Sequence, residues 1–452
     1  MNDETANIRK GNGELKRELS FRDIFFMSLG GQAPFLSMLT YATAVLILSL
    51  YFSPLVVVIG TMVVLLNGIV VFFLSKKHTE TGGYFNYAIK ELSRWLGFET
   101  GWMYIFYSIL YGAGYLAGSA FILSYVLGIN PIFSLMIAFV PASIFLLIGI
   151  KPSARYAVFA AGIEIIVLVS VIVVSLDIAH FTFYNPLQIT PSASDLFLGI
   201  LFAIGIPTGY GAITPISGEV KNAEKSIGKA VVLVIIIGGL LEALVLYGIV
   251  DAGIYQGNLS SLTSTSIPVI YLLKTYLGPY SQYLLLFAGI NDGILGSLAF
   301  FTASTRNIYA MSKRDLLPEF VSKINRRTGT PVVAGILTIT IGALVLFPSI
   351  GIYGAFATFL ALGTLAGLGN LAIHISANFS MLQSLRNSLN KKITQEIIVM
   401  TAIGLSGFIV IYSLITSVTY VILIFLGYMI IGFIAVESVY GPMNHRPFVQ
   451  DN

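Results

Sequence analysis

The sequence has 452 residues, of which 56% are hydrophobic and only 10% are charged. A water-soluble domain carries about 25% charged residues, so 25 basic and 21 acidic side chains cannot cover a soluble protein of this length. The mean hydropathy of +0.87 likewise indicates a chain too apolar for a water-soluble protein. Continuous apolar runs predict membrane helices, because backbone polar groups in lipid must be bonded within their own segment. β-barrel strands would alternate every second residue. We therefore expect an all-α integral membrane protein.

Twelve apolar runs of about 20 residues or more are long enough to span a bilayer. They are residues 22–50, 54–75, 101–127, 132–150, 156–177, 195–217, 227–250, 280–305, 331–348, 352–378, 396–415 and 418–437.

The positions of the basic residues predict the orientation of these spans. Of 25 Lys and Arg, 24 fall in the two terminal segments or in the links after the even-numbered spans, and only Lys274 lies in another link. By the positive-inside rule, both termini and the even-numbered links are cytoplasmic. This pattern predicts a multi-pass protein of the cytoplasmic membrane, with the lipid bilayer as its partner. The net charge of +4 therefore does not indicate a nucleic-acid partner.

Other residue counts exclude several kinds of chemistry. The chain contains no Cys, which excludes disulfides and thiol chemistry, and its four His are too scattered for a metal site. The first 20 residues are polar and charged, so no cleavable signal peptide is expected. No nucleophile with a neighbouring base is visible, and we expect neither an enzyme nor a cofactor.

Two spans are interrupted by Gly and Pro. The first contains Gly30 to Pro34, and the sixth contains Gly205 to Gly211. Gly tolerates non-helical torsions, while Pro removes an amide donor and clashes with the preceding turn. Non-helical backbone at membrane depth is tolerated where it lines a cavity. We expect discontinuous helices at both places, although Gly and Pro are also common in ordinary membrane helices.

The two breaks lie five spans apart, so the second break enters the membrane from the opposite side. This spacing predicts a 5+5 inverted repeat, which in transporters places the binding site at the paired breaks. The expected parts are a cytoplasmic segment 1–20, a first repeat 21–178, a second repeat 195–380, two further helices in 394–438, and a cytoplasmic segment 439–452.

Several short motifs resemble the amino acid-polyamine-organocation superfamily. They are Gly218-Glu219-Val220-Lys221-Asn222, Thr81-Gly82-Gly83-Tyr84, Gly97-Phe98 with Gly101-Trp102, Arg306-Asn307-Ile308-Tyr309-Ala310-Met311, and Thr330-Pro331. The resemblance implies a leucine-transporter-type fold that moves amino acids or related amines by alternating access. It also implies that the substrate is held between spans 1, 3, 6 and 8.

The resemblance and the physics of broken helices suggest the same substrate-binding residues. Exposed amides suit a carboxylate, and opposing carbonyls suit an ammonium group. The candidates are Gly30, Gly31, Gln32, Ala33, Gly205, Ile206, Pro207, Thr208, Gly209 and Tyr210. The Gln32 amide can select a substrate group or cap the broken helix. Tyr210 either closes over the substrate or packs.

The second break departs from the superfamily in two positions. Many relatives carry an aromatic gate at the position of Gly205, and some carry a carboxylate at the position of Gly211. The two glycines imply a roomier or differently gated pocket.

Three carboxylates lie inside predicted spans: Glu164, Glu242 and Asp292. Ionisable residues at this depth are functional candidates, and no Lys or Arg lies at the same depth to pair with them. We expect Glu164 and Asp292 to take part in proton coupling, and Asp292 also to contact a substrate amine. The alternatives for Glu164 are a part in a cation site and a protonated side chain bonded to a carbonyl. The alternative for Asp292 is a hydrated residue at a vestibule wall. Glu242 is expected to serve packing or hydration on the lipid side.

Three further residues are candidates for coupling or gating. Thr302 and Ser304 can complete a sodium site with carbonyls of the first break, although helical hydroxyls more often bond their own backbone. Glu219 is expected to pair with a Lys or Arg and to latch the inner gate. His374 is expected to be a structural hydrogen bonder.

Together these features predict a secondary active transporter of amino acids or related amines, coupled to H+. A sodium-coupled symporter, an exchanger of amino acids or polyamines, and a non-transporting sensor on the same fold stay open as alternatives. The oligomeric state is not predicted.

Overall fold

The computed structural model describes residues 15–257, 268–388 and 392–440. Most of the two predicted terminal segments, 1–20 and 439–452, lies outside the described residues. All regular elements of the described chain are helices, apart from one isolated bridge between Leu19 and Val220. The helices are α2 (Phe21–Gln32), α3 (Pro34–Ser49), α4 (Ser53–Lys77), α5 (Tyr84–Glu91), α6 (Arg94–Leu127), α7 (Pro131–Ile148), α8 (Ile150–Ile178), α9 (Ala193–Gly205), α10 (Ala223–Tyr255), α12 (Pro268–Leu277), α13 (Ser281–Ser312), α14 (Val332–Tyr353), α15 (Ala355–Arg386), α16 (Ile393–Thr416) and α17 (Thr419–Tyr440).

Among the described residues, 11 helical stretches are long and apolar enough to cross a membrane. The first stretch, Phe21–Lys77, is 57 residues long and contains α2, α3 and α4, where the sequence predicts two separate spans. The predicted class, a multi-pass helical membrane protein, is therefore confirmed. The count of twelve spans and the inverted repeat stay predictions.

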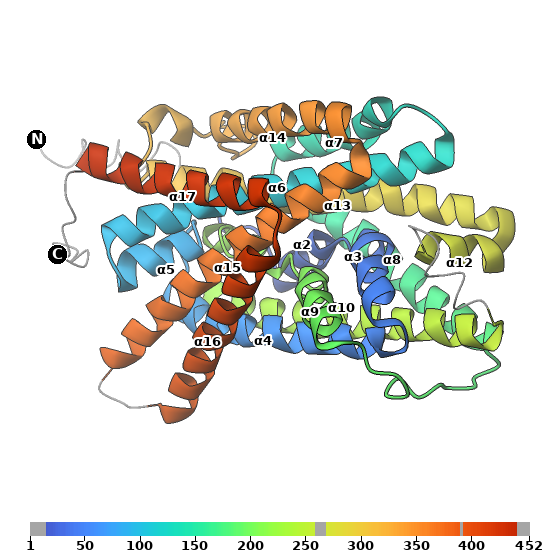
Figure 1. Ribbon diagram of the computed structural model, residues 1–452. Helices are drawn as coiled ribbons and strands as arrows, with labels where there is room; N and C mark the ends of the chain where they lie inside the picture. Colours follow the sequence, from blue (N-terminus) through green and yellow to red (C-terminus); the bar gives the residue numbers. More distant parts are fainter. Residues whose placement is uncertain (1–14, 258–267, 389–391, 441–452) are drawn as a thin grey trace, which may run out of the picture.

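The helices divide into a buried interior and a lipid-exposed periphery. In their most apolar 18-residue stretch, α6 and α13 each bury 78% of their residues, whereas α16 buries 28%. Helices α2 and α3 lie in the middle of the bundle, and α16 and α17 lie at its outside (Figure 1). Since residues 27–43, on both sides of the break between α2 and α3, are buried, their polar backbone groups must find partners inside the protein.

The first helix breaks at Ala33, as the sequence predicts. Helix α2 ends at Gln32, and Ala33 adopts a left-handed conformation with φ 45° and ψ 61°. The amide of Ala33 donates to the carbonyl of Gly30 at 3.1 Å. Helix α3 then starts at Pro34, which suits a first helical position because its missing N–H would have no helical partner there.

The second break is longer than the first. Helix α9 ends at Gly205, and the chain continues through Gly209, with φ 132°, into two 3-10 turns, η2 (Tyr210–Ile213) and η3 (Ser217–Glu219). The apolar run predicted at 195–217 is therefore helical only in its first half. Its second half carries backbone groups that side chains from other helices can reach.

The two breaks are in direct contact at a pair of glycines. A side chain at Gly209 would overlap the backbone of Gly31, and a side chain at Gly31 would come 3.3 Å from the carbonyl oxygen of Gly209. Position 209 therefore requires glycine, because the backbone of Gly31 lies closer than a Cβ atom allows, whereas a Cβ at Gly31 would make a tight contact.

We expect Gly209→Ala to destabilise the protein more than Gly354→Ala does. Both glycines have a positive φ, but a Cβ at Gly354 would meet nothing within 4 Å. The Gly354 variant should lose only the roughly 1 to 3 kcal/mol that this positive-φ, extended conformation costs a residue with a side chain. The Gly209 variant adds an overpacking cost of roughly 1 to 3 kcal/mol. Thermal unfolding in detergent measures the difference, and equal melting temperatures would contradict the packed contact between the breaks.

Candidate functional site

The first turn of α3 donates its backbone amides to two carboxylates from other helices. The amide of Phe35 donates to Glu164 Oε1 at 3.0 Å, and the amide of Leu36 donates to Asp292 Oδ2 at 2.7 Å. Pro34 has no N–H, and the amide of Ser37 donates to the carbonyl of Ala33 at 2.8 Å. The donors that a helix start normally leaves open are therefore all bonded here.

Glu164 of α8 and Asp292 of α13 form a carboxyl pair. Because their donors are neighbours in the chain, the two carboxyl groups lie side by side and interact with each other. Both side chains are buried, and Glu164 Oε2 has no hydrogen-bond partner among the described residues. Asn291 Nδ2 donates a hydrogen bond to Asp292 Oδ1 at 3.3 Å. The sequence singled out both residues but could not show that they meet.

This pair occupies the backbone amides that the sequence suggests for a substrate carboxylate at the first break. The sequence suggests that amides exposed by the broken helix bind a substrate carboxylate. In the structure, the amides of Phe35 and Leu36 hold carboxylates of the protein itself. A substrate carboxylate at this point would therefore have to displace one of them.

Gln32 joins the first break to the second. Its Nε2 donates to the carbonyl of Pro207 at 2.8 Å and to the carbonyl of Val234, in α10, at 3.2 Å. The sequence left open whether this amide binds substrate or caps the helix. The structure uses its donor side to connect the two breaks and α10.

Three tyrosines on one face of α6 bond carbonyls of the two breaks. Tyr115 donates to the carbonyl of Gln32 at 2.8 Å, Tyr111 to that of Gly205 at 3.2 Å, and Tyr104 to that of Gly211 at 3.2 Å. Spacings of four and seven residues place the three side chains on the same side of a helix. Sequence reasoning missed these residues, although tyrosine recurs at helical spacing in this span.

Tyr210 is bonded to α15. Its hydroxyl lies 2.6 Å from His374 Nε2, and the hydroxyl of Tyr84 lies 3.4 Å from the same nitrogen. His374 is therefore a hydrogen-bonding residue between two tyrosines. The other predicted break residues are also buried inside the protein. They are Gly30 and Gly31, packed against Leu295 and Ala299 of α13, Ala33, and Ile206, Pro207 and Thr208 of the second break.

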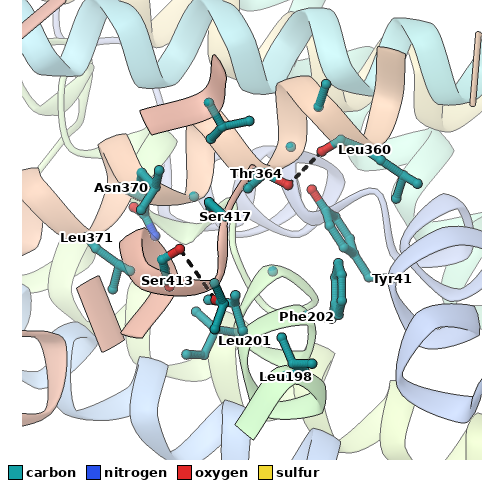
Figure 2. Close-up of a pocket in the computed structure, with 18 of the residues that line it drawn as sticks. Tyr41, Leu198, Leu201, Phe202, Leu360, Thr364, Asn370, Leu371, Ser413 and Ser417 are labelled. Atoms are coloured by element: carbon teal, nitrogen blue, oxygen red, sulfur yellow. Dashed lines mark hydrogen bonds between the residues drawn. The ribbon is translucent and has the colours of Figure 1, made fainter. Parts of the chain in front are cut away.

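A cavity of about 390 Å³ reaches the second break at Gly205 and Thr208. Figure 2 shows Tyr41 of α3 beside Leu360 and Thr364 of α15, and Asn370 of α15 near Ser413 of α16 and Ser417. No charged side chain lines it. A Cβ at Gly205 would touch the ring of Tyr41 at 3.3 Å. The cavity lies in the half of the bundle that the sequence predicts to face outside.

The opposite end of the second break is closed by a buried ion pair. Arg306 Nε lies 2.8 Å from Glu219 Oε1, and Arg306 Nη2 donates to Glu219 Oε2 at 3.3 Å. The two side chains are 1% and 2% exposed. The carbonyl of Glu219 also accepts the amides of Glu18 and Leu19, at 2.8 and 2.9 Å. The predicted cationic partner of Glu219 is thus Arg306.

Thr302 and Ser304 lie buried in α13. Ser304 Oγ has no partner among the described residues, and no described hydrogen bond links either hydroxyl to the first break. Within the described part of the chain, no group of three His, Cys, Asp or Glu residues could hold a metal ion.

Comparison with known proteins identifies the family. The family model for amino acid permeases matches residues 23–436, so the chain belongs to the amino acid permease family. Its members are transport proteins rather than enzymes, and their substrates are small molecules. The chain is 28% identical, over 163 residues, to an uncharacterized amino-acid permease of Schizosaccharomyces pombe. This alignment covers 35% of the chain and 28% of that relative.

We expect Arg306→Met to lower stability strongly, because it leaves the Glu219 carboxylate buried without its partner. Breaking a buried pair in this way costs about 3 to 5 kcal/mol. Lys151→Met is the matched control, because Lys151 pairs with Glu18 at 3.2 Å with side chains 53% and 35% exposed. Exposed pairs contribute about 0 to 1 kcal/mol. Melting temperatures in detergent test this, and a similar loss in both variants would show that the buried pair is not a major restraint.

Proposed function

We propose that the protein is a secondary active transporter that moves amino acids or related amines across the cytoplasmic membrane by alternating access, driven by protons. The observation that carries the proposal is the carboxyl pair of Glu164 and Asp292 on the amides of Phe35 and Leu36. The pair sits directly beside the break that is expected to move during transport.

The pair supports proton coupling for an electrostatic reason. Two neighbouring carboxyl groups in a buried site are more stable when they share a proton than when both are ionised. The amides of α3 stabilise one negative charge, which leaves one proton for the pair to gain or lose. A movement of α3 changes how well the amides reach the carboxylates, so it changes how tightly the proton is held.

The geometry of the breaks supports alternating access. The proposed substrate residues are those of the two breaks, Gly30 to Ala33 and Gly205 to Tyr210, with Asp292 facing a substrate amine. The cavity at Gly205 and Thr208 supports entry from the predicted outer side. Opening the predicted inner side would require the Glu219–Arg306 pair to separate, which supports a gate role for Glu219.

Three other hypotheses predict different transport behaviour. Sodium coupling through Thr302 and Ser304 would make uptake depend on Na+ and not on a proton gradient. Exchange would require amino acid on both sides of the membrane. A non-transporting sensor would bind ligand without moving it.

We expect purified protein in liposomes to accumulate a labelled amino acid or amine faster when an inward proton gradient is imposed. Glu164→Gln should abolish this stimulation, because Gln cannot carry the proton. Its side-chain oxygen can still accept the Phe35 amide, so the start of α3 keeps its cap. The matched control is Asp177→Asn, an exposed acid on the same helix, which should leave the stimulation unchanged.

Three outcomes would count against the proposal. If uptake by the unmodified protein does not change with the proton gradient, proton coupling is wrong. If the proton gradient stimulates uptake by the Glu164→Gln protein as strongly as in the unmodified protein, the pair does not carry the coupled proton. A ligand that raises the melting temperature but is never accumulated would favour the sensor.

A further inference from the structure

Glu242 of α10 is a third buried carboxylate near the breaks. Its side chain is 0% exposed, and neither carboxylate oxygen has a hydrogen-bond partner among the described residues. None of the described salt bridges involves it. Complete burial contradicts the expectation of hydration on the lipid side. An ionised Glu242 would need a positive partner here, because an isolated buried charge is strongly unfavourable, and without one the acid would hold a proton.

The groups that act on Glu242 are acids and phenols. Asp292 of α13 interacts with it electrostatically, as do Glu164 of α8 and Tyr111 and Tyr115 of α6. The surroundings are therefore negative or neutral, and they favour a positive charge beside Glu242.

A second unpartnered acceptor points to the same face of α10. Gln32 is 0% exposed and uses its Nε2 to bond Pro207 and Val234, which leaves Oε1 without a partner. A side chain at Gly238 would overlap this oxygen, so Oε1 lies directly on α10 at that position. Glu242 is one turn further along on the same face. Helical side chains lean toward the helix N-terminus, which brings the Glu242 carboxylate back toward Gly238.

A hydroxyl oxygen completes the set. A side chain at Gly239 would overlap Thr61 Oγ1, so this α4 hydroxyl also lies on α10 beside Gly238. Thr61 Oγ1 donates to the carbonyl of Val57 at 2.8 Å, and its lone pairs can still accept or coordinate. The set contains one carboxylate and two neutral oxygens. Small hard cations prefer such oxygen ligands, and one carboxylate matches one positive charge.

We propose that Glu242, Gln32 and Thr61 form a binding site for a single positive charge. The ligand is an alkali cation such as Na+ or, resting on the proposed function, the primary ammonium group of the substrate, which would then bind at Glu242 in place of Asp292. Both offer the same charge to the same oxygens. The site is separate from the Glu164–Asp292 proton pair and from the sodium site that the sequence suggests at Thr302 and Ser304. Since the bound charge contacts Gln32, it stabilises the link between the two breaks.

The test is thermal unfolding of the purified full chain at constant ionic strength. One series replaces choline chloride with NaCl, and a second replaces it with methylammonium chloride as the ammonium probe. A cation that binds only the folded protein raises the melting temperature in a saturable way. We expect such a rise in at least one series. Saturation by Na+ identifies the inorganic ion, and saturation by methylammonium alone identifies the ammonium group.

Variants locate the effect. Glu242→Gln should raise the half-saturating cation concentration about tenfold or more, because a contact to a charged group is lost. Glu242→Asp keeps the negative charge but has a shorter side chain, so its carboxylate lies further from the cation. It should give a smaller increase in the half-saturating concentration, and it replaces the Gln variant if that protein does not fold. Ser304→Ala should leave the half-saturating concentration unchanged.

Several results would overturn the proposal. They are a melting temperature that responds to neither cation, an unchanged response in the Glu242 variants, and a response lost in Ser304→Ala but kept in Glu242→Gln. A melting temperature that follows only pH would assign Glu242 a proton instead. Because these are binding measurements, their failure leaves the liposome assay of transport untouched.

Discussion

The hydrogen bonds from the amides of Phe35 and Leu36 to Glu164 and Asp292 are the interaction on which the rest of the site depends. They fix the start of α3 against α8 and α13 at the depth where the first membrane helix is broken. A broken helix inside a bilayer is tolerable only when its free donors are bonded, and here the partners are ionisable. The same two bonds therefore stabilise the break, and in the proposed mechanism they make its position sensitive to a proton.

The carbonyls of the breaks are held by a different set of residues. Tyrosines from one face of α6 donate to carbonyls of both breaks, and the Gln32 amide crosses from the first break to the second. Each such bond contributes about 1 kcal/mol. A conformational change that exchanges several of them for others would therefore have a modest net cost. These bonds are between neutral groups, so Glu164 and Asp292 are the groups whose charge has the largest effect on the position of the break.

Much of the fold could be predicted from the sequence, because composition, apolar run length and the placement of basic residues are local properties. The breaks at Ala33 and after Gly205 were equally visible, since Gly and Pro act on their own backbone. Contacts between distant segments were not visible. Glu164 and Asp292 each stood out as acids in apolar runs, but their pairing depends on how α8 and α13 pack around α3. For Glu242, the alternative of hydration on the lipid side was wrong for the same reason, because the exposed side of α10 cannot be predicted from a helix that is apolar all round.

The central claim is that the carboxyl pair binds the transported proton. It is tested most directly by measuring proton exchange when substrate is added to purified protein in weakly buffered solution with a pH-sensitive dye. The account predicts that the unmodified protein takes up or releases protons on saturating substrate, that Glu164→Gln loses this signal while still binding substrate, and that Asp292→Asn also loses the signal. An equal proton signal in the unmodified protein and in both variants would contradict it.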